Sequence, residues 1–162
     1  MAASVQLIEK HGVGGTATDK TLQSIRFKNA DDALVDTASP MVVSGVSDFS
    51  FEKWLRLNIT GGTYTQITNV RAYSDGANGL GTGVLVWAKS VASYLPPTQP
   101  TNSSGWTFFF SLLVGSPLVL GTGPYTGTGE IANHLVLMCE VQNTAVGGIT
   151  PNESVFFVWD EI

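Results

Sequence analysis

The histidines, the carboxylates and the single cysteine are the residues of this chain that could carry chemistry, but their spacing assembles no catalytic motif. His11 and His134 are the only imidazoles, and neither belongs to a two-histidine metal motif. A triad built on His134 would need a nucleophile elbow, and Gly-x-Ser-x-Gly does not occur. We expect His134 to be exposed or capped at the start of a strand. The carboxylates are scattered and no pair stands out for acid–base hydrolysis, so we expect no enzymatic activity.

Cofactor and metal motifs are missing in the same way. Cys139 is the only cysteine, so no intramolecular disulfide can form, and its parity with Leu137 and Val141 predicts a small buried hydrophobic side chain. Three glycine-rich stretches, at 12–15, 76–83 and 121–129, do not continue into Gly-Lys-Ser/Thr, as a phosphate loop would. We interpret Asp31-Asp32 and Asp75-Gly76 as turn-forming pairs in preference to calcium ligands. We therefore expect no cofactor and no metal.

Composition excludes two classes of partner. Only 13% of the 162 residues are charged, against about 25% in ordinary soluble domains, and the net charge is −5. With eight Lys and Arg residues and no basic cluster, the chain lacks a footprint for direct nucleic-acid binding. The apolar stretch 106–120 is interrupted by Ser, Gly and Pro and is shorter than the ~20 residues of a spanning helix, so we expect no membrane partner. The N-terminus has no secretory pattern, which predicts synthesis and retention inside a cell, or release by lysis.

The stretch from Phe49 to Thr60 predicts a strand with one wet face. Phe49, Phe51, Leu55, Leu57 and Ile59 share one parity and we expect them to point inward, whereas charged and polar residues occupy the other. Trp54 is the exception, because it lies on the polar parity. Cover by a neighbouring loop is the interpretation we favour, and an exposed contact is the alternative. Gly61-Gly62 then ends the strand, and 64–73 predicts a second strand paired with it in a hairpin.

Further short strands are expected along the whole chain. They are placed at 5–10, 22–28 with Ile25 and Phe27 inward, 41–43, 84–89, 106–114, 134–141 and 155–159. Seven to nine such strands separated by turn signals predict an all-β fold: a single antiparallel β-sandwich, jelly-roll-like, with a β-barrel as the alternative. We expect residues 1–20 to form an N-terminal strand or arm with a flexible loop, and residues 21–162 to form the sandwich.

A forty-residue segment from Ser90 to Gly129 contains no charged residue. Its aromatic part would be hard to keep soluble on a free surface. We expect 108–114 to enter the core, and the Pro- and Gly-rich flanks to form an assembly surface. The isolated protein is therefore expected to self-associate or to bind a large assembly.

Four segments, taken in order, resemble a known group of proteins. They are FSFEKWLRL from Phe49, ITNVRAY from Ile67, NHLVLMCEV from Asn133 and FFVWDEI from Phe156. In this order they are similar to small virion structural proteins of tailed bacteriophages, of the head-decoration or cement type. The resemblance implies a β-rich, non-enzymatic protein made in the host cytoplasm and placed on the outer capsid surface of the virion. It also implies the major capsid protein as partner and a homo-oligomer, with a trimer favoured.

Two functions follow as hypotheses. The first is decoration and stabilisation of a capsid. Its expected interface is the outward face of the predicted hairpin, because Trp and Arg are enriched at interface hot spots. The residues expected there are Trp54, Arg56, Arg71 and Tyr73. The second is a carbohydrate- or receptor-binding β-sandwich of the tail or fibre type. In that case exposed aromatic residues would stack on sugar rings; the candidates are Trp54, Tyr64, Tyr73 and Tyr125.

Overall fold

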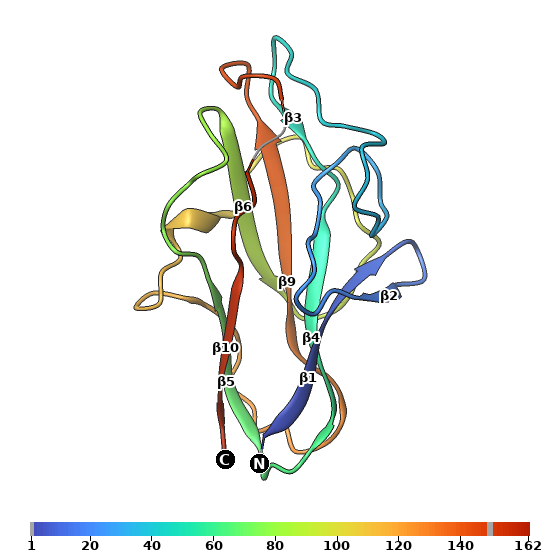
Figure 1. Ribbon diagram of the computed structural model, residues 1–162, viewed down its shortest axis with the longest axis vertical. Helices are drawn as coiled ribbons and strands as arrows, with labels where there is room; N and C mark the ends of the chain where they lie inside the picture. The colour runs from blue at the N-terminus through green and yellow to red at the C-terminus, as the bar shows by residue number, and fades with distance from the viewer. Residues whose placement is uncertain (1, 149–150) are drawn as a thin grey trace.

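The computed structural model describes residues 2–148 and 151–162 and is almost entirely β-structure. Figure 1 shows an elongated molecule with both termini at one end and a group of loops at the other. The elements are β1 (Ala3–His11), β2 (Thr16–Asp19), β3 (Asp48–Phe49), β4 (Lys53–Gly62), β5 (Ile67–Tyr73), β6 (Val84–Val91), β7 (Thr107–Phe108), η1 (Phe109–Ser111), β8 (Leu118–Gly121), β9 (Gly129–Val141) and β10 (Phe156–Glu161). The prediction of an all-β antiparallel fold is confirmed.

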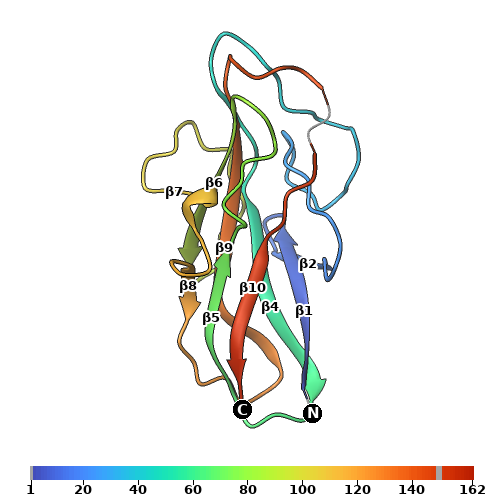
Figure 2. The same cartoon turned by 60° about the vertical axis from the view of Figure 1, so that its left-hand side comes forward.

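Two sheets of unequal size face one another. In the described residues the larger sheet has the order β2-β1-β4-β9-β6-β7, with β3 added beside β9, and the smaller sheet has the order β10-β5-β8. All pairings are antiparallel. The smaller sheet lies in front of the larger one over the half of the molecule near the termini (Figure 2). This end of the molecule is a sandwich, and irregular segments cover the rest of the larger sheet.

Side-chain alternation places the core between the sheets. Leu55, Leu57 and Ile59 of β4 are buried on the inner face, as their parity predicts, and Leu135 and Leu137 of β9 join them. β9 differs from an ordinary half-buried strand because Val136 and Met138, on its other face, are also completely buried. The larger sheet is therefore covered on both faces.

The uncharged segment provides much of this cover. Residues 92–106 lie over the outer face, where the Tyr94 ring meets the Trp54 ring with centroids 5.3 Å apart and the Thr98 carbonyl accepts a hydrogen bond from the Glu52 N–H. The chain then passes to the inner side, where Phe109 and Phe110 are buried in the core. The expected strand at 106–114 is replaced by β7 and the short helix η1. The uncharged segment 90–129 therefore packs against both faces of the larger sheet, which is consistent with its lack of charged side chains.

The expected hairpin between 49–60 and 64–73 is wrong. β4 pairs with β1 and β9 in the larger sheet, whereas β5 pairs with β10 and β8 in the smaller one. The chain crosses between the sheets after Gly62, whose φ of +106° and close approach to the backbone of Ala3 leave no room for a Cβ. The outward faces of β4 and β5 therefore point away from each other, on opposite sides of the molecule.

Four local expectations also change. Residues 49–60 are not one strand: β3 ends at Phe49 and β4 begins at Lys53, because Ser50 turns inward and its hydroxyl accepts a hydrogen bond from the Cys139 N–H. Phe49 and Phe51 are consequently half-buried rather than central to the core. Residues 22–28 and 41–43 are irregular. The strand expected at 5–10 is present as part of β1, which lies between β2 and β4, but residues 16–19, expected in a flexible loop, form β2.

Candidate functional site

Buried charges gather under the long segment that follows β2. On the inner face, Glu9 Oε1 lies 3.2 Å from Lys53 Nζ, and Glu9 Oε2 lies 3.7 Å from Lys20 Nζ. All three side chains are almost completely buried. Each lysine also donates to a loop carbonyl, Lys20 to Ala33 O and Lys53 to Asp32 O, both at 2.6 Å. The three residues, here called the inner charge cluster, therefore fasten the segment 20–47 to the sheet.

Lys28 links two parts of the same segment to each other. Its ammonium lies 2.7 Å from Asp32 Oδ1 and 3.0 Å from Asp36 Oδ1. Burial lowers the pKa of Lys28, but the hydrogen bonds with the two carboxylates outweigh it and the net pKa is raised. These contacts pair the ammonium of Lys28 with two carboxylates of its own segment.

A polar and aromatic cluster lies on the outer face, under residues 92–106. Trp54 donates its indole N–H to Glu52 Oε2 at 3.1 Å, and Lys89 Nζ lies 2.8 Å from Glu52 Oε1. The Trp54 ring also packs edge-on against the ring of His134. Tyr94 closes the cluster and donates its hydroxyl to Gly12 O at 2.6 Å. Burial raises the pKa of Tyr94 to about 12, so the phenol stays protonated.

His134 is buried, which corrects the expectation of an exposed or capped side chain. Its Nδ1 lies 3.3 Å from Val91 O, and Nε2 is buried without a hydrogen-bond partner among the described residues. Burial lowers the pKa of His134, and the nearby Arg56 guanidinium lowers it further. No carboxylate hydrogen-bonds the imidazole, so the arrangement lacks the oriented base of a triad.

The remaining chemistry-bearing residues are also held structurally. Cys139 is buried as predicted, and burial raises the pKa of its thiol to about 12, far from a reactive thiolate. Within the described residues, no group of three or more His, Cys, Asp or Glu side chains could hold a metal ion. None of the described helices is long and apolar enough to cross a membrane.

The four residues expected to form an interface are not brought together. Trp54 is only 2% exposed, because the loop cover that we favoured is present. Arg56 lies beside it on the outer face and pairs with Glu130 at 3.0 Å. Arg71 and Tyr73 lie on β5 in the other sheet, where Arg71 pairs with Asp160 and Tyr73 stacks on Phe156. The burial of Trp54 also removes it as a platform for sugar rings.

The strongest candidate for a contact surface is the end of the molecule opposite the termini. Three loops meet there, 37–47, 76–83 and 142–148, and Figure 1 shows them grouped at the top. We call this surface the tip. Loops 37–47 and 142–148 expose apolar side chains, with Val46 73% and Val146 88% exposed and Val42 and Val43 also exposed. The chain carries no charge from 37 to 47, from 76 to 88, or from 141 to 152.

The tip is held in shape by acidic residues that turn inward. Asp48 Oδ2 accepts hydrogen bonds from the Val42 N–H at 2.7 Å and from the Asn29 amide at 3.0 Å. Glu140 accepts from the Trp87 indole and the Ser47 hydroxyl, both at 2.9 Å. These carboxylates fix the loop conformation, and the oxygens that do so are occupied by hydrogen bonds within the chain. The outward surface of the tip is therefore uncharged, with exposed valines among small polar residues, and hydrogen bonds within the chain hold its loops in shape.

Sequence reasoning missed the tip, although a signal was present. Each uncharged run resembles an ordinary loop, and only the fold shows that three of them meet. The chain matches no protein-family model, no curated protein and no solved structure.

Proposed function

We propose that the protein is a non-enzymatic structural component of a virus particle, which decorates and stabilises the capsid by docking its tip on the major capsid protein. The observation that carries the proposal is the uncharged tip, with its exposed valines and its hydrogen-bonded loops. Interface cores are depleted in charged residues, and the tip has this composition. The resemblance of four segments to head-decoration proteins supplies the type of partner.

The rest of the molecule supports a mechanical role. Both faces of the larger sheet are covered. The inner irregular segment is fastened by the ion pairs of Glu9 with Lys20 and Lys53, and the outer one by hydrogen bonds between Glu52 and Thr98. Such a scaffold presents the tip with little loss of conformational entropy on docking. A capsid offers many identical sites, so a weak contact made by each copy adds up across the lattice.

The test is co-sedimentation of the purified chain with capsids of the virus that encodes it. We expect saturable binding and a higher temperature of capsid disruption. The triple variant Val42→Ser, Val46→Ser, Val146→Ser should lose binding, because it removes the exposed apolar groups of the tip while leaving the core intact.

The matched control is Val13→Ser, Leu22→Ser, Val119→Ser, which removes three exposed apolar side chains away from the tip. It should bind as the unaltered chain does. Failure of the unaltered chain to bind capsids contradicts the proposed function, and normal binding by the tip variant contradicts the assignment of the docking surface. Sedimentation equilibrium of the free chain tests the proposed trimer separately.

A further inference from the structure

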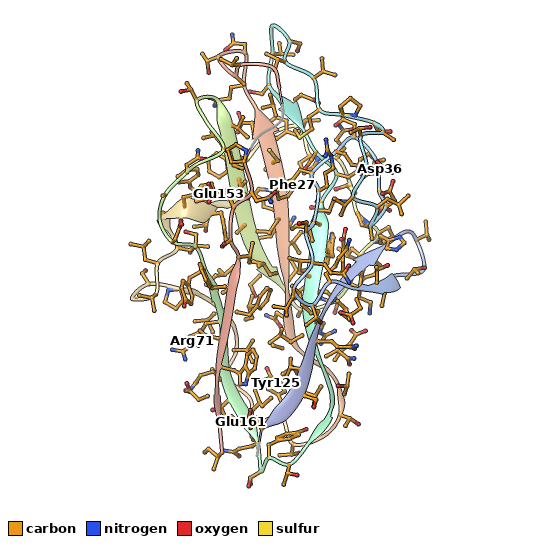
Figure 3. All side chains as sticks on the ribbon, viewed as in Figure 1. Phe27, Asp36, Arg71, Tyr125, Glu153 and Glu161 are labelled. Carbon is orange, nitrogen blue, oxygen red and sulfur yellow. The ribbon has the colours of Figure 1, made fainter. Side chains whose placement is uncertain are left out.

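A cavity of about 450 Å³ lies between the inner face of the larger sheet and the irregular segments that cover its upper half. Its floor includes Val86 on β6 and Leu137 and Cys139 on β9. Phe27 and Val155 line it from the two covering segments. Figure 3 labels Phe27 and Glu153, which belong to these two segments. The volume falls within the range of about 300–1,000 Å³ that small-molecule sites occupy, and is far larger than the voids of a close-packed interior.

The floor of this cavity suits an apolar occupant. Val86, Leu137 and Cys139 are buried side chains that offer no strong hydrogen-bonding group. Ordered water needs about two to four polar partners, which this floor does not supply. An alkyl or aromatic group in contact with the floor would gain the free energy of apolar burial.

One unpaired cation lines the same cavity. Arg26 makes no ion pair and no side-chain hydrogen bond with any described residue, although each of the other seven Lys and Arg side chains forms an ion pair. Glu153 also lines the cavity, but its carboxylate lies against Gly79 in loop 76–83 of the tip. The guanidinium is thus the charged group left free to bind a ligand, and its geometry suits a carboxylate held by two hydrogen bonds.

We propose that the cavity binds a small amphipathic carboxylate, with the apolar body against Val86, Leu137 and Cys139 and the carboxylate on Arg26. The inference does not rest on the proposed capsid function. It assigns the unpaired Arg26 and the apolar floor of the cavity to the two ends of one ligand.

The test measures binding of decanoate to the full chain by isothermal titration calorimetry, with decylamine as the probe of opposite charge. We expect decanoate to bind at one site per chain and decylamine to bind at least about tenfold more weakly. Arg26→Gln should weaken decanoate binding by about tenfold or more, the effect of losing a charge-assisted hydrogen bond. Glu153→Gln is the matched control at the same cavity and should leave decanoate binding unchanged or slightly tighter.

Cys139 gives an independent readout, because it lies on the floor of the cavity. Decanoate at about ten times its dissociation constant for the unaltered chain should slow the reaction of Cys139 with methyl methanethiosulfonate about tenfold there, and only about twofold in Arg26→Gln. Val86→Phe should fill the cavity and abolish decanoate binding. If that variant does not fold, Met41→Trp blocks the cavity from the half-exposed side of the covering segment.

Three results would overturn the proposal: no saturable decanoate binding, equal binding by Arg26→Gln, or tighter binding of decylamine. A fourth is that decanoate fails to bind while Val86→Phe loses capsid binding, since the cavity would then receive a side chain of the docking partner. The first three results do not bear on whether the unaltered chain binds capsids.

Discussion

The inner face of the larger sheet is covered in two different ways along its length. Near the termini the strands β10, β5 and β8 cover it, and the side chains between the sheets are apolar, as with Leu57, Ile59 and Ile67. Further up, the irregular segment 20–47 covers it, and the buried residues there include Glu9, Lys20, Lys28 and Lys53. One face of one sheet therefore changes from an apolar core to one in which buried charges lie beside a second apolar cluster that includes Val84, Cys139 and Val141.

The difference follows from the backbone of the covering segment. A strand satisfies its N–H and C=O groups in its own ladder, whereas an irregular segment carries groups that need partners when buried. Lys20 and Lys53 provide such partners to Ala33 and Asp32, and Glu9 balances their charge. The outer face obeys the same rule, since Glu52 accepts from the Thr98 N–H of the segment 92–106. In this protein, the irregular segments that cover the larger sheet are held to it by buried polar side chains.

The largest expected effect comes from removing the shared carboxylate of the inner charge cluster. Glu9→Ala leaves Lys20 and Lys53 buried without a counter-charge, and loss of one partner of a buried ion pair costs about 3–5 kcal/mol. We expect a loss of this size in the free energy of unfolding measured by urea denaturation.

The triple variant Glu9→Leu, Lys20→Met, Lys53→Met distinguishes two roles of the inner charge cluster: balancing buried charge and attaching the segment 20–47 to the sheet. Removing all three charges should restore much of the stability, because no unpaired charge remains. The segment 20–47 should nevertheless become more sensitive to proteolysis, since Ala33 O and Asp32 O lose their donors. Unchanged protease resistance in the triple variant would show that the charges do not fasten the loop.

The next effect tests the region covered by strands. Leu57→Ala removes a side chain that is 4% exposed between the two sheets, and we expect a loss of about 2–5 kcal/mol through cavity formation. The same urea measurement applies. Val119→Ala, at an exposed position of β8, is the control and should change stability by no more than about 0.5 kcal/mol. Similar losses in both variants would contradict the assigned core.

A pH effect tests the loop cover on the outer face. The pKa of His134 is lowered from 6.5 by burial first and by the Arg56 cation next, whereas the unfolded chain keeps the ordinary value. As the pH falls below about 6.5, the unfolded chain takes up a proton that the folded chain refuses, so stability declines until the lowered folded pKa is reached. Thermal unfolding between about pH 5 and pH 7 measures this decline.

His134→Leu should flatten that pH dependence, because it removes the titrating group. Tyr94, Lys10, Arg56 and Glu130 surround the imidazole, and among them Glu130 has a lowered pKa and titrates below this window. An unchanged slope in the variant would assign the pH dependence to another group.

The smallest effect is expected at the outward face of the smaller sheet. Arg71 and Asp160 form an ion pair with side chains 32% and 53% exposed, and exposed pairs contribute about 0–1 kcal/mol. Arg71→Gln should therefore change the free energy of unfolding by less than about 1 kcal/mol in the urea assay. A loss comparable with that of Glu9→Ala would mean that solvent exposure does not determine how much an ion pair contributes to the stability of this protein.

Much of the fold could be predicted because alternation along a strand is local information. The inward rows of Leu55, Leu57 and Ile59 and of Leu135 and Leu137 were predicted correctly, as was the burial of Cys139. The candidate site could not be predicted in the same way. Arg71 was grouped with Trp54 because consecutive strands often form hairpins, but β4 and β5 belong to different sheets.

The sequence by itself determined which side chains of β4 and β9 point into the core, the near-absence of helix, and the neutrality of the segment 90–129. Tertiary structure alone decided which strands pair, that Trp54 and His134 are buried beneath a loop, and that three uncharged runs meet at the tip. The physical reason is that side-chain alternation depends on neighbours two residues apart. Backbone hydrogen bonds between strands are the same for any partner, so the choice of partner depends on how the whole chain packs.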